Sequence, residues 1–263
     1  MNIIKRELKA NLKALIIWSI SFMALFGMAA AEFSAYQGQS EAVNAFLDSL
    51  PAALKQAFGL AELRLDLPEG YYGYLAGFII LATSIYAVLA GAQILSKEIN
   101  KKTAETTFTL PVTRTRIIAM KMTAAVINCV ILTAVTFIGT LAAFAAFDIG
   151  PDFISGVAVF MLFIFLLQLL FLLAGLLASV LTKRHKLTGT MVASITIGIY
   201  FLSFIYKLGE NTEFLKYFIP FEYFPASDVI HGNSLELFGF IIVPVLIAAF
   251  FFTSFKLVVK KDI

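Results

Sequence analysis

Six long stretches without a charged residue set what this chain can fold into. They span residues 14–31, 70–96, 122–147, 153–182, 187–206 and 237–255, and each is 18 to 30 residues long. A helix needs about 20 apolar residues to cross the hydrocarbon core of a bilayer. The chain is 60% hydrophobic and only 14% charged, which is too apolar for a soluble domain. Apolar and polar residues do not alternate, as they would in a β-barrel. The sequence therefore predicts an all-α, polytopic membrane protein with six transmembrane helices.

The basic residues give an expected orientation. With six crossings, 16 of the 20 Lys and Arg residues fall on the side that holds both termini, and 13 of the 17 acidic residues fall on the other. Cytoplasmic loops are enriched in Lys and Arg, so we expect both termini in the cytoplasm and the protein in the plasma membrane. The first stretch has an alternative interpretation as a cleaved signal peptide, because Ala29–Ala31 is similar to a cleavage site. Its apolar core exceeds the usual signal length, so we favour a retained helix.

The N-terminal segment, residues 1–13, is amphipathic. Ile4, Leu8 and Leu12 recur at near-helical spacing, while lysines occupy other faces. This pattern is typical of a helix lying in the membrane interface. The alternative is an ordinary cytoplasmic tail.

Two longer connections are expected outside the membrane. Residues 32–69 keep a helical period that Pro51 interrupts, which predicts two short helices on the outer face. Residues 207–236 place aromatic residues around Pro220 and Pro225, which predicts short interfacial or re-entrant helices; a surface loop with an aromatic belt is the alternative. No internal repeat divides the chain, so residues 1–263 are expected to form a single domain.

The sequence lacks the motifs that usually mark nucleotide-binding, metal-binding or catalytic sites. It contains no G-x-x-x-x-G-K-[ST] phosphate-binding loop and no H-E-x-x-H motif. The six stretches contain no ionisable Asp, Glu, Lys, Arg or His, although such residues usually mark proton pathways within membranes. We therefore expect no catalytic, cofactor or metal site in this chain. Nucleic-acid binding is not expected, because topology already explains the basic side.

A few polar residues do fall within the predicted helices, among them Gln93, Asn128 and Gln168. They either hydrogen-bond between helices or line a substrate path, and the sequence leaves both open. Gly73 and Gly77 have the spacing that permits close helix approach.

The most distinctive segment is the inner connection at residues 96–121, SKEINKKTAETTFTLPVTRTRIIAMK. Residues 103–109 are compatible with a short helix along the membrane, and Pro111 then breaks the chain. Thr113 is placed to cap the helix that follows. Arg114 and Arg116 oppose the dipole of that helix, so topology or an acidic partner surface explains them better than helix stability does.

In this segment the chain resembles the permease subunit of ABC-2-type ATP-binding cassette transporters. That family has a Glu, a basic-Gly-Thr step and a Leu-x-x-Pro-[Val]-[Ser/Thr]-Arg element between its second and third helices. The matching residues are Glu98, Lys102, Thr103, Glu105, Leu110, Pro111, Val112, Thr113, Arg114 and Lys121. The family's usual glycine before Thr103 is absent here, and Leu110 directly precedes Pro111. The six-helix layout extends the resemblance over nearly the whole chain.

The resemblance implies a transport mechanism. Two permease copies, or this chain and a paralogue, would form the pathway in contact with membrane lipids, and separate ATPase subunits would bind ATP and Mg. The inner connection would contact the ATPase. The residues expected at that contact are Glu98, Lys102, Thr103, Glu105, Leu110, Pro111, Arg114 and Arg116. The expected activity is export of a hydrophobic or amphipathic substrate such as a drug, peptide or lipid. An intramembrane peptidase-like enzyme and a non-transporting scaffold or regulatory protein are the alternatives.

Overall fold

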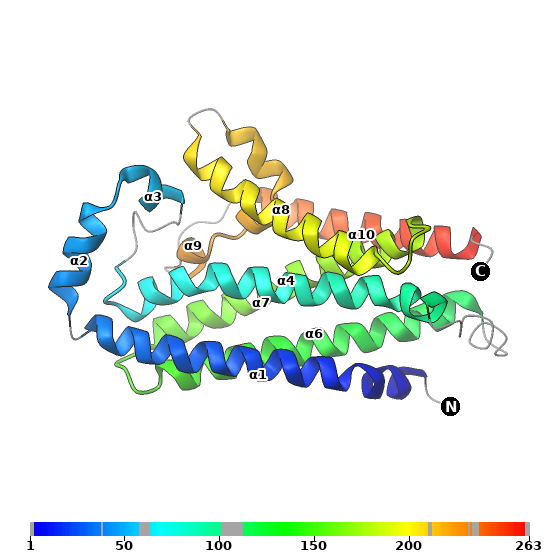
Figure 1. The fold of residues 1–263 in the computed structure, drawn as a ribbon, viewed down its shortest axis with the longest axis horizontal. Coiled ribbons are helices and arrows are strands. Elements are labelled where there is room, and N and C mark those ends of the chain that lie inside the picture. The colour runs from blue at the N-terminus through cyan, green and yellow to red at the C-terminus, as the bar shows by residue number, and fades with distance from the viewer. Residues whose placement is uncertain are drawn as a thin grey trace.

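Six long helices form the body of the protein in the computed structural model (Figure 1). The structure describes residues 3–37, 39–57, 64–100, 113–209, 212–230, 232 and 237–260, and for residues 98, 100, 114, 259 and 260 it describes the backbone alone. The long helices are α1 (Ile3–Gln37), α4 (Pro68–Asn100), α6 (Arg114–Phe144), α7 (Pro151–Leu181), α8 (Thr188–Leu208) and α10 (Leu237–Lys260). Each is long and apolar enough to cross a membrane. The predicted all-α, six-helix membrane protein is confirmed.

The long helices run alongside one another, and both ends of the chain lie at the same end of the bundle (Figure 1). We call this end the basic end, because lysines and arginines of several helices and their connections gather there, including Lys9, Lys97, Lys121 and Lys183. The helices α2 (Ser40–Ser49) and α3 (Ala52–Ala57) lie at the opposite end. Cytoplasmic placement of the basic end stays a prediction from the charge pattern.

Residues 3–13 are helical, as predicted, and they continue without a break into the first crossing helix. Their location in the membrane interface stays a prediction.

The centre of the bundle is α7, which buries residues along its whole length, from Phe153 to Val180. A helix that is apolar on all sides is expected at such a central position. Its main neighbour is α4, and the two backbones touch at Gly91 and Gly175. A Cβ atom at Gly91 would overlap the carbonyl oxygen of Leu172, and one at Gly175 would overlap the carbonyl oxygen of Val88. Small residues allow this kind of close approach in membranes, so α4 and α7 form a backbone-close seam.

Short helices connect the long ones at the end opposite the basic end. Between α1 and α4 lie α2 and α3, separated at Pro51, which confirms the predicted pair of short helices. Between α8 and α10 lie η1 (Glu213–Phe218), η2 (Pro220–Glu222) and α9 (Ala226–Ile230), which confirms short helices in the described part of residues 207–236.

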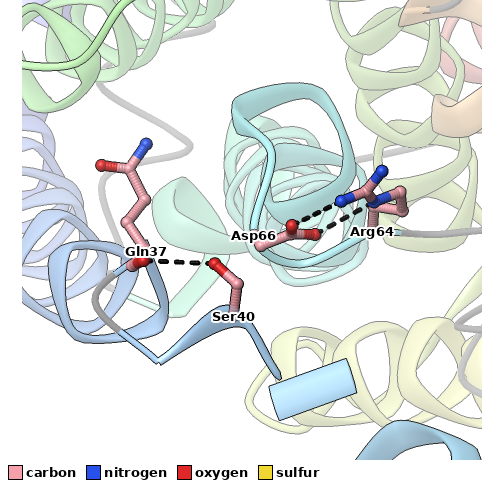
Figure 2. Close-up of polar contacts among 4 residues, drawn as sticks. All are labelled: Gln37, Ser40, Arg64 and Asp66. Atoms are coloured by element: carbon pink, nitrogen blue, oxygen red, sulfur yellow. Dashed lines mark hydrogen bonds and ion pairs between the residues drawn. The ribbon is translucent and has the colours of Figure 1, made fainter. Parts of the chain in front are cut away.

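Side-chain hydrogen bonds hold the turns on either side of α2 and α3 (Figure 2). The hydroxyl of Ser40 donates to the backbone carbonyl of Gln37 at 3.1 Å, where α1 gives way to α2. Just before α4, Arg64 Nη2 donates to Asp66 Oδ2 at 2.7 Å, and Arg64 Nε donates to Asp66 Oδ1 at 3.2 Å. The Arg64 guanidinium lowers the pKa of the Asp66 carboxyl below its ordinary value, because its hydrogen bonds favour the charged form.

Candidate functional site

The structure describes only part of the inner connection that sequence analysis singled out. Lys102, Thr103, Glu105, Leu110 and Pro111 lie outside the described residues, as does the short helix expected at residues 103–109. The backbone places Glu98 in the last turn of α4 and Arg114 in the first turn of α6. The two flanks of the connection therefore lie at the basic end, and the contacts expected of these residues stay predictions.

The start of α6 is capped as predicted. The side-chain oxygen of Thr113 accepts a hydrogen bond from the backbone N–H of Arg116 at 3.4 Å. This bond satisfies one of the backbone donors that a helix start leaves without a partner. The side chain of Arg116 is exposed beside the cap, where it is available to a partner surface.

The N-terminal part of α1 is joined to both helices that flank the inner connection. Lys121 Nζ of α6 lies 3.1 Å from Glu7 Oε1 of α1, and the two side chains are only 2% and 10% exposed. Arg6 Nη2 lies 3.7 Å from the same oxygen. Lys97 Nζ of α4 donates to Asn11 Oδ1 of α1 at 3.2 Å. The sequence alone does not reveal these contacts, because they join segments far apart in the chain.

The polar residues within the helices occupy different environments. Gln168 of α7 is fully buried, and its Oε1 accepts a hydrogen bond from Thr133 Oγ1 of α6 at 3.2 Å. Asn128 of α6 is also buried, whereas Gln93 of α4 is exposed on the surface of the bundle. Gln168 thus makes the interhelical hydrogen bond that sequence analysis considered, with a partner that it did not name.

A cavity of about 390 Å³ lies at the end opposite the basic end, between α4, α8 and the segment that contains η2. Its walls are largely aromatic. The rings that line it include those of Tyr74, Phe160, Tyr200, Phe204, Phe221 and Phe224. Lys207 and Glu222 also line the cavity, and Lys207 Nζ lies 3.1 Å from Glu222 Oε1. The cavity therefore combines an apolar wall with one ion pair, which suits an amphipathic guest.

Ring stacking fixes the wall of the cavity that η2 supplies. Phe221 stacks on Phe171 of α7 with ring centroids 5.2 Å apart, and Phe224 stacks on Phe163 of α7 at 4.1 Å. Because Pro220 begins η2 and restricts its backbone, Glu222 is held on a short, anchored element.

The segment beside η2 is also well packed. The Tyr223 hydroxyl donates to the carbonyl of Tyr217 at 2.7 Å, and burial raises the pKa of Tyr223. The aromatic cluster and its prolines were visible in the sequence. The pairing of Glu222 with Lys207 was not, because nothing in the local pattern relates the two.

No set of three or more His, Cys, Asp or Glu residues is positioned to hold a metal ion in the part of the chain that the structure describes. The fold and the site thus define a multi-pass membrane protein with an aromatic cavity at one end and a basic surface at the other. A family model described as "ABC-2 family transporter protein" matches residues 1–224, which include α1 to α8. The chain belongs to this family and is a membrane component for transport. No curated protein and no solved structure matches the chain.

Proposed function

We propose that this chain is the permease subunit of an ATP-driven exporter in the plasma membrane. A separate ATP-binding cassette subunit supplies ATP hydrolysis, and a second permease copy or a paralogue completes the pathway. The observation that carries the proposal is the family match over residues 1–224. The missing phosphate-binding loop agrees with it, because a chain that cannot cradle ATP needs a partner that can.

The contacts of α1 support a route for coupling. The inner connection leaves α4 near Lys97 and enters α6 near Thr113, and α1 contacts both helices through Asn11 and Glu7. A displacement of the connection by the ATPase would therefore move three helices together. Rigid-body motion of packed helices is a common form of conformational switching. In this proposal Glu98, Arg114 and Arg116 contact the ATPase together with the other predicted residues of the connection.

The aromatic cavity supports a hydrophobic or amphipathic substrate. It opens among rings of α4 and α8, and its one ion pair offers a polar contact at the edge of an apolar wall. Sites of this kind bind ligands by burying apolar surface and orient them through a few polar groups. Export rather than import is the direction proposed by family resemblance.

Co-purification with the cognate ATPase tests the proposal. We expect a stable complex whose ATPase rate rises when a cargo is added, and we expect Glu98→Gln and Arg114→Ala to reduce that stimulation several-fold. Glu41→Gln is the matched control, because Glu41 is exposed on α2 at the other end of the bundle. Hydrolysis of ATP by vesicles that contain this chain alone, or normal coupling in both variants, would contradict the proposal.

A further inference from the structure

We propose that the cavity between α4, α8 and η2 binds lipophilic organic cations, with Glu222 as the fixed counter-charge and Lys207 as an internal cation that the ligand displaces. This inference deepens the proposed function, because it names the substrate class. Binding itself requires only this chain, so it can be tested without any ATPase.

The two members of the ion pair differ in how freely they can move. The Glu222 side chain is 8% exposed and sits on η2, which Phe221 anchors to α7. The Lys207 side chain is 34% exposed and stands in the last turn of α8. A lysine has a flexible four-carbon stem that lets its ammonium group reach water. The lysine can therefore leave the pair, whereas the carboxylate stays in the cavity.

Charge balance favours an exchange of cations at Glu222. A buried carboxylate without a partner is strongly unfavourable. In the empty cavity Lys207 supplies that partner at 3.1 Å. When an organic cation takes this position, the carboxylate stays paired and the released ammonium becomes hydrated. An anionic ligand would have to bind beside the carboxylate, which costs repulsion.

The aromatic wall of the cavity also favours a cation over an anion. Tyr200 meets Phe204 at an interplanar angle of 81° and Phe221 at 89°, with ring centroids 5.6 and 5.4 Å apart. These rings at the cavity are therefore nearly perpendicular to one another and do not stack face to face. The faces of aromatic rings attract cations through their quadrupole and repel anions.

Ser203 adds a polar side chain to the lining of the cavity. It lines the cavity and is 4% exposed, yet its hydroxyl has no hydrogen-bond partner among the described residues. Buried polar groups normally find a partner. Ser84 and Ser254, which do not line the cavity, also have no partner among the described residues, so the ion pair and the aromatic wall are the observations that carry the inference.

Binding of two isosteric ions tests the inference on the purified full chain in detergent. Tetraphenylphosphonium and tetraphenylborate have nearly the same shape and opposite charge. We expect saturable binding of the phosphonium and none of the borate. Glu222→Gln should weaken phosphonium binding by about tenfold or more, whereas Lys207→Gln should strengthen it, because the competing cation is gone. Glu213→Gln is the matched control, because Glu213 is exposed on η1 and does not line the cavity.

The opposite pattern would overturn the inference. Preferred binding of the borate together with weaker binding in Lys207→Gln would identify an anion site. Equal affinities of both variants and the unchanged chain would show that the ion pair has no role in binding. The comparison of the two ions on the unchanged chain does not depend on how well any variant folds. Failure of the chain to couple to an ATPase, with phosphonium binding intact, would reject the proposed function alone.

Discussion

The two ends of the bundle each hold a lysine–glutamate pair at 3.1 Å, and the surroundings of the two pairs differ. At the basic end, Lys121 and Glu7 are both nearly inaccessible and packed between α6 and α1. At the opposite end, Lys207 is one-third exposed and shares a cavity with Glu222. We therefore interpret the enclosed Glu7–Lys121 pair as a structural contact that holds α1 against α6. The Lys207–Glu222 pair, which borders the cavity, is the one that a ligand can exchange.

The close packing of α4 against α7 connects the two ends of the bundle. The α4–α7 seam brings two backbones into contact at Gly91 and Gly175. On its other side, α4 faces α8 across the aromatic cavity. Motion imposed at the basic end can therefore pass along the seam to the wall of the cavity.

The largest expected effect comes from breaking the seam. Gly175→Leu places a side chain where the Val88 carbonyl lies, and it should destabilise the protein by more than about 3 kcal/mol. Thermal unfolding in detergent, followed by size-exclusion chromatography, measures the loss. Gly27→Leu on α1 is the matched control, since a Cβ atom there meets nothing within 4 Å. Equal stability of the two variants would show that the backbones are not in contact.

The second effect concerns the enclosed ion pair. Lys121→Met leaves the buried Glu7 carboxylate with Arg6 at 3.7 Å as its nearest described cation. We expect a loss of about 3 kcal/mol in unfolding free energy, near the low end of values for a broken buried pair. The double variant Glu7→Gln/Lys121→Met should recover much of the loss, because the buried side chain at position 7 no longer carries a charge. A double variant no more stable than Lys121→Met would reject the structural role of the pair.

The third effect concerns the ion pair at the cavity and compares it with the enclosed pair at the basic end. Lys207→Met should cost about 2 kcal/mol in the same assay, less than Lys121→Met. The lysine is partly hydrated and gains little from its pair, but the Glu222 carboxylate that it leaves is buried. A loss of unfolding free energy as large as that of Lys121→Met would mean that the Lys207–Glu222 pair is also a structural contact.

The smallest effect is expected at the most exposed pair, Arg64–Asp66. Arg64 lowers the pKa of Asp66 below the ordinary value of 3.8, so the charged form is favoured in the folded state. Its contribution to stability is present above the unfolded pKa and is lost as the pH falls through the lowered one. Asp66→Asn should slightly lower the melting temperature at neutral pH, where this contribution is present. It should also flatten the acid limb, so that the two melting-temperature profiles converge at low pH. An unaltered acid limb would show that the pair does not contribute.

The sequence was sufficient to predict the long helices and the cap at the start of α6. Charge-free stretches located all six long helices, and Pro51 located the break between α2 and α3. Thr113 was correctly placed as a cap, because capping depends only on residues three apart. These features are local, so periodicity and composition reveal them.

Contacts between distant segments could not be predicted in the same way. Gly73 and Gly77 have a favourable spacing, but the backbones of α4 and α7 touch at Gly91 and Gly175. Which face of a helix meets its neighbour depends on packing and not on spacing alone. The pairs Glu7–Lys121 and Lys207–Glu222 depend on that packing too, and so does the cavity.

The central claim is that the basic end faces the cytoplasm and receives an ATPase at the inner connection. A single cysteine at Arg116→Cys, with the buried native Cys129 replaced by alanine, tests it directly, because Arg116 is exposed at the start of α6. We predict labelling by a membrane-impermeant maleimide in inside-out vesicles, protection when the ATPase is bound, and no labelling in right-side-out vesicles. Labelling from the outside would contradict the account.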